Sequence, residues 1–362
     1  MTDRAHLEFT VAVQDALPGN VVWSPFSVAS ALALVARGAE GATRDELVAL
    51  LTGDKAGQVE QLIRLLGEAE DVVVPHSDDE RPEIAVSNTL WADERVRINS
   101  GFADALTSMP SGSVRTAPFG KDPDRARTEI NEDVARTTHD LIQDLLPDGV
   151  IKHDTVAALV NALYLKVGWR HAFTESATTP RPFHTPGGRV QVPMMFVSET
   201  LGYARTSGWQ VVQLPTVGQV EAVVLLPDGD LPEVDAGSLE TLLAAPKRQA
   251  VSLRLPKLSL KLQAELTPVL NTLGVRTVFT DDANLSGISA DPLAVQAVLH
   301  ETVLKLDEQG LEGAAATAVM MRVLSFNPQQ PVEVVVDRPF LLLVRHTRTG
   351  AVYFSARVTD PS

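Results

Sequence analysis

Residues 310–331 read GLEGAAATAVMMRVLSFNPQQP, and they separate two segments with strand patterns. Residues 298–306 (VLHETVLKL) precede the stretch and residues 332–344 (VEVVVDRPFLLLV) follow it. Both segments are rich in β-branched and apolar side chains, which favours strands. A connection this long inside a compact domain is uncommon and usually has a function. We therefore expect a loop with a role of its own.

Read with a period of two, the stretch has one small, mostly apolar row and a second row with two charged residues. The first row is Leu311, Gly313, Ala315, Thr317, Val319 and Met321, and the second is Glu312, Ala314, Ala316, Ala318, Met320 and Arg322. Such alternation is typical of a half-buried strand, but a run of alanines forms strands poorly. The stretch could stand exposed in one state and join a sheet in another. Its composition also fits an Ala-rich surface loop without a role.

The composition is that of a folded, soluble protein with one large domain or two small ones. The chain has 362 residues, of which 44% are hydrophobic and 21% are charged, and this allows a substantial core. The formal net charge of -15 argues against general binding to nucleic acids or membrane surfaces, since both are anionic. The chain has no cysteine, which excludes disulfides, thiol nucleophiles and thiolate metal sites.

No targeting or membrane-spanning segment is predicted. The first residues, MTDRAHLEFTVAVQDAL, mix acids and bases and lack the apolar core of a secretory signal. No run approaches the roughly 18 apolar residues of a membrane span. The simplest expectation is a cytoplasmic protein, and secretion of a longer precursor remains open.

Helical and strand patterns occur in separate groups, which predicts an α+β fold with large sheets. Ser24 or Ser27 can cap a helix, and Thr43 with Glu46 fits the capping box of the next helix. Residues 155–166 (TVAALVNALYLK) form an apolar run whose β-branched and aromatic residues favour a central buried strand.

The sequence lacks the local motifs of common enzymes: there is no G-x-S-x-G, P-loop, G-x-G-x-x-G or H-E-x-x-H. His300-Glu301 begins a zincin-like string, but Leu304 stands where its second histidine belongs. The eight histidines form no ligand-spaced pair, so we expect no metal and no cofactor. A hydrolase whose Ser, His and Asp lie far apart in the chain remains an alternative.

Five strings in order along the chain resemble the serpin family of serine protease inhibitors. They are NVVWSPFSVASALALVARGAEGATRDEL from Asn20, VNALYLKVGW from Val160, FTDDANLSGIS from Phe279, VLHETVLKLDEQG from Val298 and DRPFLLLVRHTRTGAVYFSARV from Asp337. The resemblance extends from about residue 20 to the C-terminus. The short N-terminus without a signal resembles a prokaryotic, thermopin-like (bacterial) member.

The resemblance implies one serpin domain over residues 1–362, with three β-sheets, a dominant central sheet and about nine helices. Residues 308–331 then correspond to the exposed reactive-centre loop. In inhibitory serpins a protease cuts this loop, and the freed arm enters the central sheet while the protease is still attached as an acyl-enzyme. The implied function is irreversible inhibition by a metastable suicide substrate, not enzymatic turnover.

The resemblance also implies a hinge at the start of the loop. The hinge positions are Glu308, Gly310, Leu311, Glu312, Gly313, Ala314, Ala315, Ala316 and Thr317. Gly310 and Gly313 offer flexible pivots, and the small row suits insertion between two strands. Leu311 departs from the family pattern, which usually has Thr, Ser or Val there, so insertion is expected to be slower.

Counting along the loop places the bond that the protease cuts. In the family the segment from the hinge glutamate to the residue before the bond is commonly seventeen long, which from Glu308 ends at Leu324. The expected bond is Leu324–Ser325, with Met321 and Phe326 as neighbouring alternatives. Leucine suits chymotrypsin-like, subtilisin-like or some elastase-like proteases with an apolar primary pocket.

Two further groups match family positions. The shutter, a polar cluster beneath the opening strands of the central sheet, comprises Ser24, Ser27, Asn161 and His300. Such a network can hold one strand arrangement and reform in another, although each residue could merely cap a helix or satisfy a backbone group. The breach, where the loop first enters the sheet, comprises Trp169 and Lys257, although Trp169 could be plain core. Lys257 is expected to pair with Glu308, contributing about 1 kcal/mol or less.

The implied partner is a serine protease, and the implied protein is a monomer without nucleic-acid, membrane or glycosaminoglycan partners. Residues 67–83 (GEAEDVVVPHSDDERPE) are acidic, whereas heparin-activated serpins carry a basic helix near here. The alternative is a non-inhibitory serpin that acts as a binding or chaperone-like protein. The Ala-rich hinge disfavours that alternative, and Leu311 keeps it open.

Overall fold

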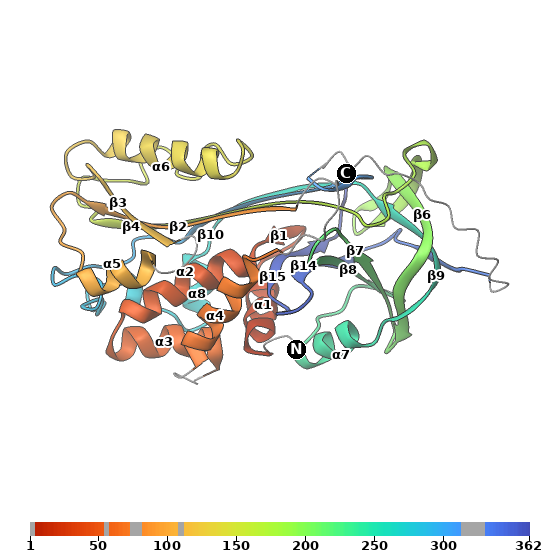
Figure 1. Cartoon of the computed structure of the whole chain (residues 1–362), viewed down its shortest axis with the longest axis horizontal. Helices are drawn as coiled ribbons and strands as arrows, with labels where there is room; N and C mark the ends of the chain where they lie inside the picture. The colour runs from red at the N-terminus through yellow and green to blue at the C-terminus, as the bar shows by residue number, and fades with distance from the viewer. Residues whose placement is uncertain (1–3, 54–57, 73–81, 108–111, 313–329) are drawn as a thin grey trace.

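The computed structural model describes residues 4–53, 58–72, 82–107, 112–312 and 330–362, without the side chains of Ser87 and Leu159. Most neighbouring strands are antiparallel, with β2–β3 and β9–β13 parallel, and helices pack against the sheets, so the α+β class is confirmed (Figure 1). The α-helices in these ranges are α1 (Arg4–Ala16), α2 (Pro25–Gly38), α3 (Gly41–Thr52), α4 (Val59–Ala69), α5 (Ser100–Thr107), α6 (Pro123–Thr137), α7 (Ala236–Ala244) and α8 (Thr267–Thr272). None of these described helices is long and apolar enough to cross a membrane.

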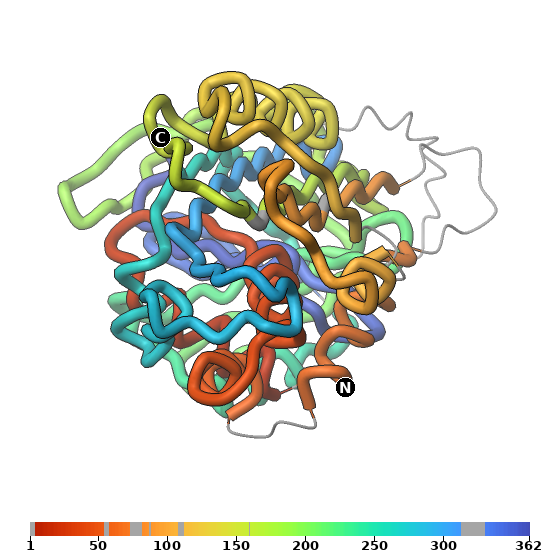
Figure 2. Tube along the Cα trace, turned by 90° about the vertical axis from the view of Figure 1, so that its left-hand side faces the viewer, coloured from red at the N-terminus to blue at the C-terminus, as the bar shows by residue number. Residues whose placement is uncertain are grey.

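The central sheet has six strands in the order β10-β11-β12-β4-β2-β3. Their bounds are β2 (Glu83–Asp93), β3 (Gly112–Ala117), β4 (Ala157–Gly168), β10 (Leu258–Glu265), β11 (Leu299–Leu306) and β12 (Gly310–Leu311). The sheet runs along the molecule with α6 on one face and α2, α3 and α4 on the other (Figure 1). The end view of Figure 2 again places the yellow tube of α6 opposite the red tube of the N-terminal helices.

Both faces of β4 are buried, which confirms the central strand expected from its apolar run. Leu163 and Leu165 pack in the main core together with α2. Val160 and Ala162 pack with Ile130 of α6 in a second cluster. Because side chains alternate along a strand, odd-numbered residues of β4 face α2 and even-numbered residues face α6.

The second sheet has nine strands, in the order β1-β15-β14-β8-β7-β6-β9-β13 with β5 paired to β6. Their bounds are β1 (Val21–Trp23), β5 (Thr179–Thr185), β6 (Gly188–Thr206), β7 (Trp209–Pro215), β8 (Val220–Pro227), β9 (Lys247–Pro256), β13 (Val332–Val335), β14 (Phe340–His346) and β15 (Val352–Val358). The expected count of three sheets is corrected to two in the described residues. The 19-residue strand β6 pairs with β9 along one part and with β7 along another. It therefore connects the strands on its two sides into one continuous sheet.

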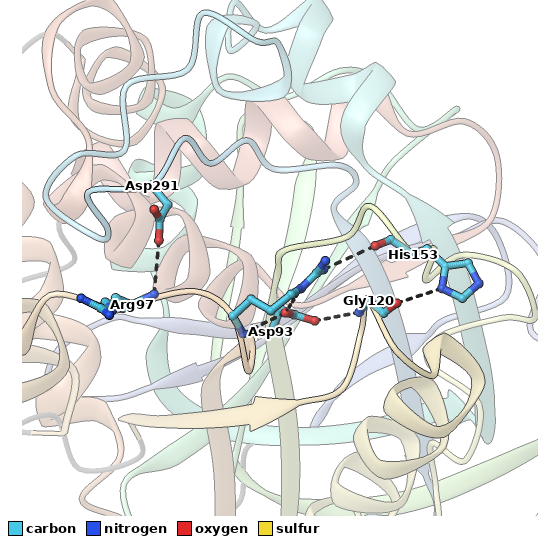
Figure 3. A network of polar contacts seen from close by, with 6 residues as sticks. Asp93, Arg97, Gly120, His153 and Asp291 are labelled. Carbon is cyan, nitrogen blue, oxygen red and sulfur yellow. Dashed lines mark hydrogen bonds and ion pairs between the residues drawn. The ribbon is translucent and has the colours of Figure 1, made fainter.

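A polar network fixes the end of the central sheet away from β12 (Figure 3). Asp93, at the end of β2, accepts hydrogen bonds from the N–H of Gly120 at 2.7 Å and from Arg95 Nε at 2.5 Å. His153 Nδ1 lies 3.0 Å from the carbonyl oxygen of Gly120. Burial alone would raise the pKa of Asp93, but the hydrogen bonds from Arg95 and Gly120 hold that pKa below its usual value. The network joins β2 to the turns before α6 and β4.

Candidate functional site: the loop hinge and the open central sheet

The central sheet is open between β4 and β11. The two-residue strand β12 lies between them and is antiparallel to both, with Leu311 paired to Val167 of β4 and to Leu306 of β11. Beyond Leu311, no hydrogen-bonded pairing joins β4 to β11 in the described part of the chain. Two parallel strands that share a partner at only one end have room for a further antiparallel strand. We call this opening the slot.

Two cavities mark the slot along its length. One of about 10 Å³ lies beneath Glu312 and is lined from both strands by Leu163, Tyr164, Leu165, Val303, Leu304 and Lys305. An apolar cavity of about 110 Å³ lies at the opposite end, where its lining includes Leu34, Ala158, Val160, Val298 and Leu299. Both strands therefore present side chains to space that an added strand could fill.

Gly310 and Leu311 occupy the top of the slot. A Cβ atom on Gly310 would lie 2.2 Å from the carbonyl oxygen of Val167, so only glycine allows this close approach of two strands. Leu311 is only 1% exposed and belongs to the main core. The sheet thus accommodates the side chain that departs from the family pattern, while slower insertion stays a prediction.

Of the two breach residues, Lys257 contacts the hinge residue Glu308, and Trp169 contacts Asp307 directly before it. Lys257 Nζ lies 2.5 Å from Glu308 Oε2, and Thr178 Oγ1 donates to Glu308 Oε1 at 2.7 Å. Burial alone would raise the pKa of Glu308, but the hydrogen bonds from Lys257 and Thr178 hold it below its usual value. Trp169 Nε1 donates to the carbonyl oxygen of Asp307 at 2.8 Å. A role of these contacts in guiding the hinge stays a prediction.

Three of the four shutter residues lie together. Ser24 caps α2, since its Oγ accepts from the N–H of Ser27 at 3.1 Å, and its own N–H donates to His300 Nε2 at 3.1 Å. Asn161 does not join them, because its Nδ2 donates to Asn88 Oδ1 of β2. His300 therefore connects the start of α2 to β11 by a hydrogen bond, whereas Asn161 connects β4 to β2. The two halves of the predicted cluster lie on opposite sides of the slot.

Folding stability should fall as the pH is lowered from about 6.5 to about 4. Burial lowers the pKa of His300 and of His6 from 6.5 to about 4. Within this window the unfolded chain binds more protons than the folded one, so each histidine removes up to roughly 3 kcal/mol of stability at the acid end.

Urea unfolding at pH 7.5, 5.5 and 4.5 measures this loss of folding stability. His300→Gln should flatten the slope, and the change His184→Gln at an exposed position should not. A parent midpoint that stays constant over this range would contradict the assignment.

Several predicted residues lie outside the described part of the chain. They are Gly313, Ala314, Ala315, Ala316 and Thr317 of the hinge, the Leu324–Ser325 bond with its alternatives Met321 and Phe326, and residues 73–81 of the acidic stretch.

Sequence reasoning missed two residues that shape the site. Asp307 Oδ1 accepts from the N–H of Gln309 at 2.9 Å and of Gly310 at 3.2 Å, a turn that its Asp-x-x-Gly spacing could have indicated. Tyr164 donates from its hydroxyl to Glu312 Oε1 at 3.2 Å. No local signal marks that tyrosine, because it lies within an otherwise apolar run.

The comparisons agree on one family. The profile of the serpin family (serine protease inhibitor) matches residues 8–361. The chain is 31% identical to Serpin-Z1C of Triticum aestivum, over 94% of this chain and 90% of that protein. It is also 31% identical to Iris of Ixodes ricinus, over 94% of this chain and 92% of that protein. These relatives come from a plant and a tick, so membership of a bacterial group stays a prediction.

Solved structures give the same result for the fold. Uncleaved ovalbumin superposes with a TM-score of 0.85 at 25% identity, covering 99% of both chains. Human thyroxine-binding globulin in complex with thyroxine gives a TM-score of 0.85 at 23% identity, covering 99% of this chain and 98% of that one. Matches over almost the whole length, in profile, sequence and fold, show that the chain belongs to the serpin family, whose members are generally protease inhibitors.

Proposed function

We propose that the protein is an irreversible, single-use inhibitor of serine proteases with an apolar primary pocket, in which the cut loop fills the slot. The observation that carries this proposal is β12, since Gly310 and Leu311 already form a strand between β4 and β11. A loop that continued in the same direction would complete the existing sheet.

The register of β12 supports a continuous insertion. Leu311 lies opposite Val167 and Leu306, so seven residues further on Ala318 would lie opposite Val160 and Leu299. Leu311 faces the core, and the odd-numbered residues after it would face the core as well. These are the small residues Gly313, Ala315 and Thr317. Small inward side chains allow a strand to enter without displacing its neighbours.

Packing would supply the driving force. Each new hydrogen bond contributes about 1 kcal/mol, but each ordered residue loses about 1–2 kcal/mol of backbone entropy, so these two contributions nearly cancel. In the same register Val319 would reach the cavity of about 110 Å³. Filling a void of that size gains about 3 kcal/mol. The uncut protein would therefore be metastable relative to the inserted state.

The chemistry would be that of an interrupted proteolysis. The serine oxygen of the protease attacks the carbonyl carbon of Leu324, the bond to Ser325 nitrogen breaks, and the protease histidine transfers the serine proton to the new amine. An ester then links the protease to Leu324. Inhibition requires that insertion into the slot is faster than attack of water on this ester.

One gel tests the proposal. The protein is mixed with chymotrypsin or subtilisin and separated in SDS, and mass spectrometry identifies the new termini. We expect an SDS-resistant complex and a new N-terminus at Ser325. Cleaved product with full protease activity and no complex would contradict inhibition. Cleavage after Met321 or Phe326 would show that the reactive bond is not Leu324–Ser325.

A non-inhibitory binding role is the second candidate. One matched structure of the same fold is a thyroxine-binding globulin in complex with thyroxine, so the fold is compatible with small-molecule binding. Under this alternative the loop would be cut without trapping the protease, which the same gel detects.

A further inference from the structure

The strand β12 ends at Leu311 because the backbone of the next residue, Glu312, does not continue it. Glu312 has φ of +66°, in the left-handed region that residues with a side chain rarely adopt. Its N–H still donates to the carbonyl oxygen of Lys305 on β11 at 2.7 Å. The residue is thus held against the sheet in a conformation that cannot continue a strand. A further step into the slot requires φ at Glu312 to return to the extended region.

A tyrosine of β4 holds the side chain of Glu312 at the mouth of the slot. The Tyr164 hydroxyl donates to Glu312 Oε1 at 3.2 Å, while Oε2 is buried without a hydrogen-bond partner. Burial raises the pKa of Glu312, and the Tyr164 hydrogen bond and the charges of Lys305, Lys166 and His139 oppose that rise. The hydroxyl therefore stabilises a carboxyl group that is partly withdrawn from water.

The segment after α6 holds Tyr164 in turn. The ring of His139 lies 4.4 Å from the Tyr164 ring, measured between centroids. His139 Nε2 lies 2.9 Å from Glu83 Oε1 on β2. Leu141, from the same segment, lines the small cavity beneath Glu312. The mouth of the slot is therefore closed by contacts from the hinge, from β4 and from this segment.

The sheet register offers Glu312 a different set of partners. Leu311 lies opposite Val167 and Leu306, so an extended Glu312 would lie opposite Lys166 and Lys305. Directly opposite side chains on neighbouring strands share a face and interact. Extension would thus exchange one tyrosine hydroxyl for two flanking ammonium groups, and the hydrogen bond to Tyr164 has to break first.

We propose that Glu312, Tyr164 and His139 form a latch that holds the hinge with two residues inserted and sets the rate at which the rest of the loop enters the slot. The latch rests on the proposed function, since it controls the same insertion. Tyr164 and His139 are positioning residues, because they act on the loop through Glu312.

Stopped-flow fluorescence tests the latch. The chain has no cysteine, so Ala318→Cys accepts a single environment-sensitive label. The labelled protein is mixed with enough chymotrypsin that cutting is not rate-limiting, and the fluorescence change reports insertion. Tyr164→Phe, which removes only the hydroxyl, should speed insertion about tenfold, the effect of one hydrogen bond to a charged group. Tyr203→Phe is the matched control, because Tyr203 donates to Gln210 Oε1 at 3.3 Å in the other sheet.

Two further variants complete the test. Glu312→Gln keeps an acceptor for Tyr164 but loses the attraction to Lys166 and Lys305, so it should insert no faster than the parent. His139→Ala removes the ring that packs against Tyr164, so it should speed insertion about threefold. If Tyr164→Phe does not fold, this variant tests the latch in its place.

The outcomes separate the latch from the proposed function. If the loop of the parent protein inserts at the same rate as that of Tyr164→Phe and of His139→Ala, the latch is contradicted, but the proposed function is not. Equal acceleration by Glu312→Gln and Tyr164→Phe also overturns it, since the hydrogen bond would then not be the restraint. A loop that is cut without any fluorescence change in the parent or the variants overturns the proposed function and the latch together.

Discussion

Cutting the loop at Leu324–Ser325 should raise the midpoint of heat unfolding by about 4 °C or more. Among the residues that the structure describes, no strand pairing joins β4 to β11 beyond Leu311, and a cavity of about 110 Å³ lies at the far end of the slot. Filling that cavity and packing the inserted strand should gain several kcal/mol. For a chain of 362 residues each 1 kcal/mol shifts the midpoint by about 1.3 °C, because the entropy of unfolding grows with chain length.

Calorimetry of intact and nicked protein measures this shift, with mass spectrometry to confirm that only the loop was cut. The nicked protein must keep both fragments together, since the fragment that begins at Ser325 is then held only by the non-covalent contacts of β13, β14 and β15. An unchanged midpoint would contradict a metastable uncut state, and a lower midpoint would do so more strongly.

Leu311→Arg should abolish trapping and turn the protein into a substrate. Leu311 is 1% exposed between β4 and β11, and an unpaired charge buried there costs several kcal/mol. Each 1.4 kcal/mol corresponds to a factor of ten. We therefore expect more than a tenfold rise in the number of inhibitor molecules consumed per protease molecule trapped.

Leu311→Ala is the matched control for this prediction. It removes the bulk of the side chain without adding charge, and alanine resembles the small residues that follow in the loop. This variant should keep trapping proteases, with a stoichiometry close to that of the parent. Equal trapping by Leu311→Arg and Leu311→Ala would show that an apolar side chain at this buried position is not required for insertion of the loop. Nicked Leu311→Arg should also lack the rise in heat resistance.

Local chemistry accounts for the parts of the fold that the sequence predicted. The apolar run at 155–166 became the central strand β4, because a continuous run of β-branched and apolar residues fits a strand buried on both faces. Ser24 caps α2 through its hydroxyl, as expected. Gly310 was expected as a flexible pivot, but its observed role is close approach, since a Cβ atom would meet the carbonyl oxygen of Val167.

Tertiary contacts decided the parts that the sequence could not predict. Thr43 and Glu46 were expected to form a capping box, but α3 begins at Gly41 and both side chains bind other segments instead. Glu46 accepts from the N–H groups of Arg276 and Thr277, and Thr43 Oγ1 accepts from the N–H of Asn284. A local pattern cannot distinguish a side chain that caps its own helix from one that caps a distant turn.

The same limit applies to the site. The separation of Asn161 from His300 depends on the slot between β4 and β11, which is a property of strand pairing and not of either residue. The contact of Tyr164 with Glu312 joins positions 148 apart in the chain. The pairing of β6 with both β7 and β9, which merges two expected sheets into one, likewise has no local signal.

Amide hydrogen exchange of β4 and β11, before and after the loop is cut, tests the central claim most directly. If the freed arm forms a strand in the slot, amides of 157–165 and 299–305 should become strongly protected, and residues 313–320 should become protected with them. If the cut arm exchanges as fast as a free peptide while β4 and β11 are unchanged, the loop does not enter the sheet and the account is wrong.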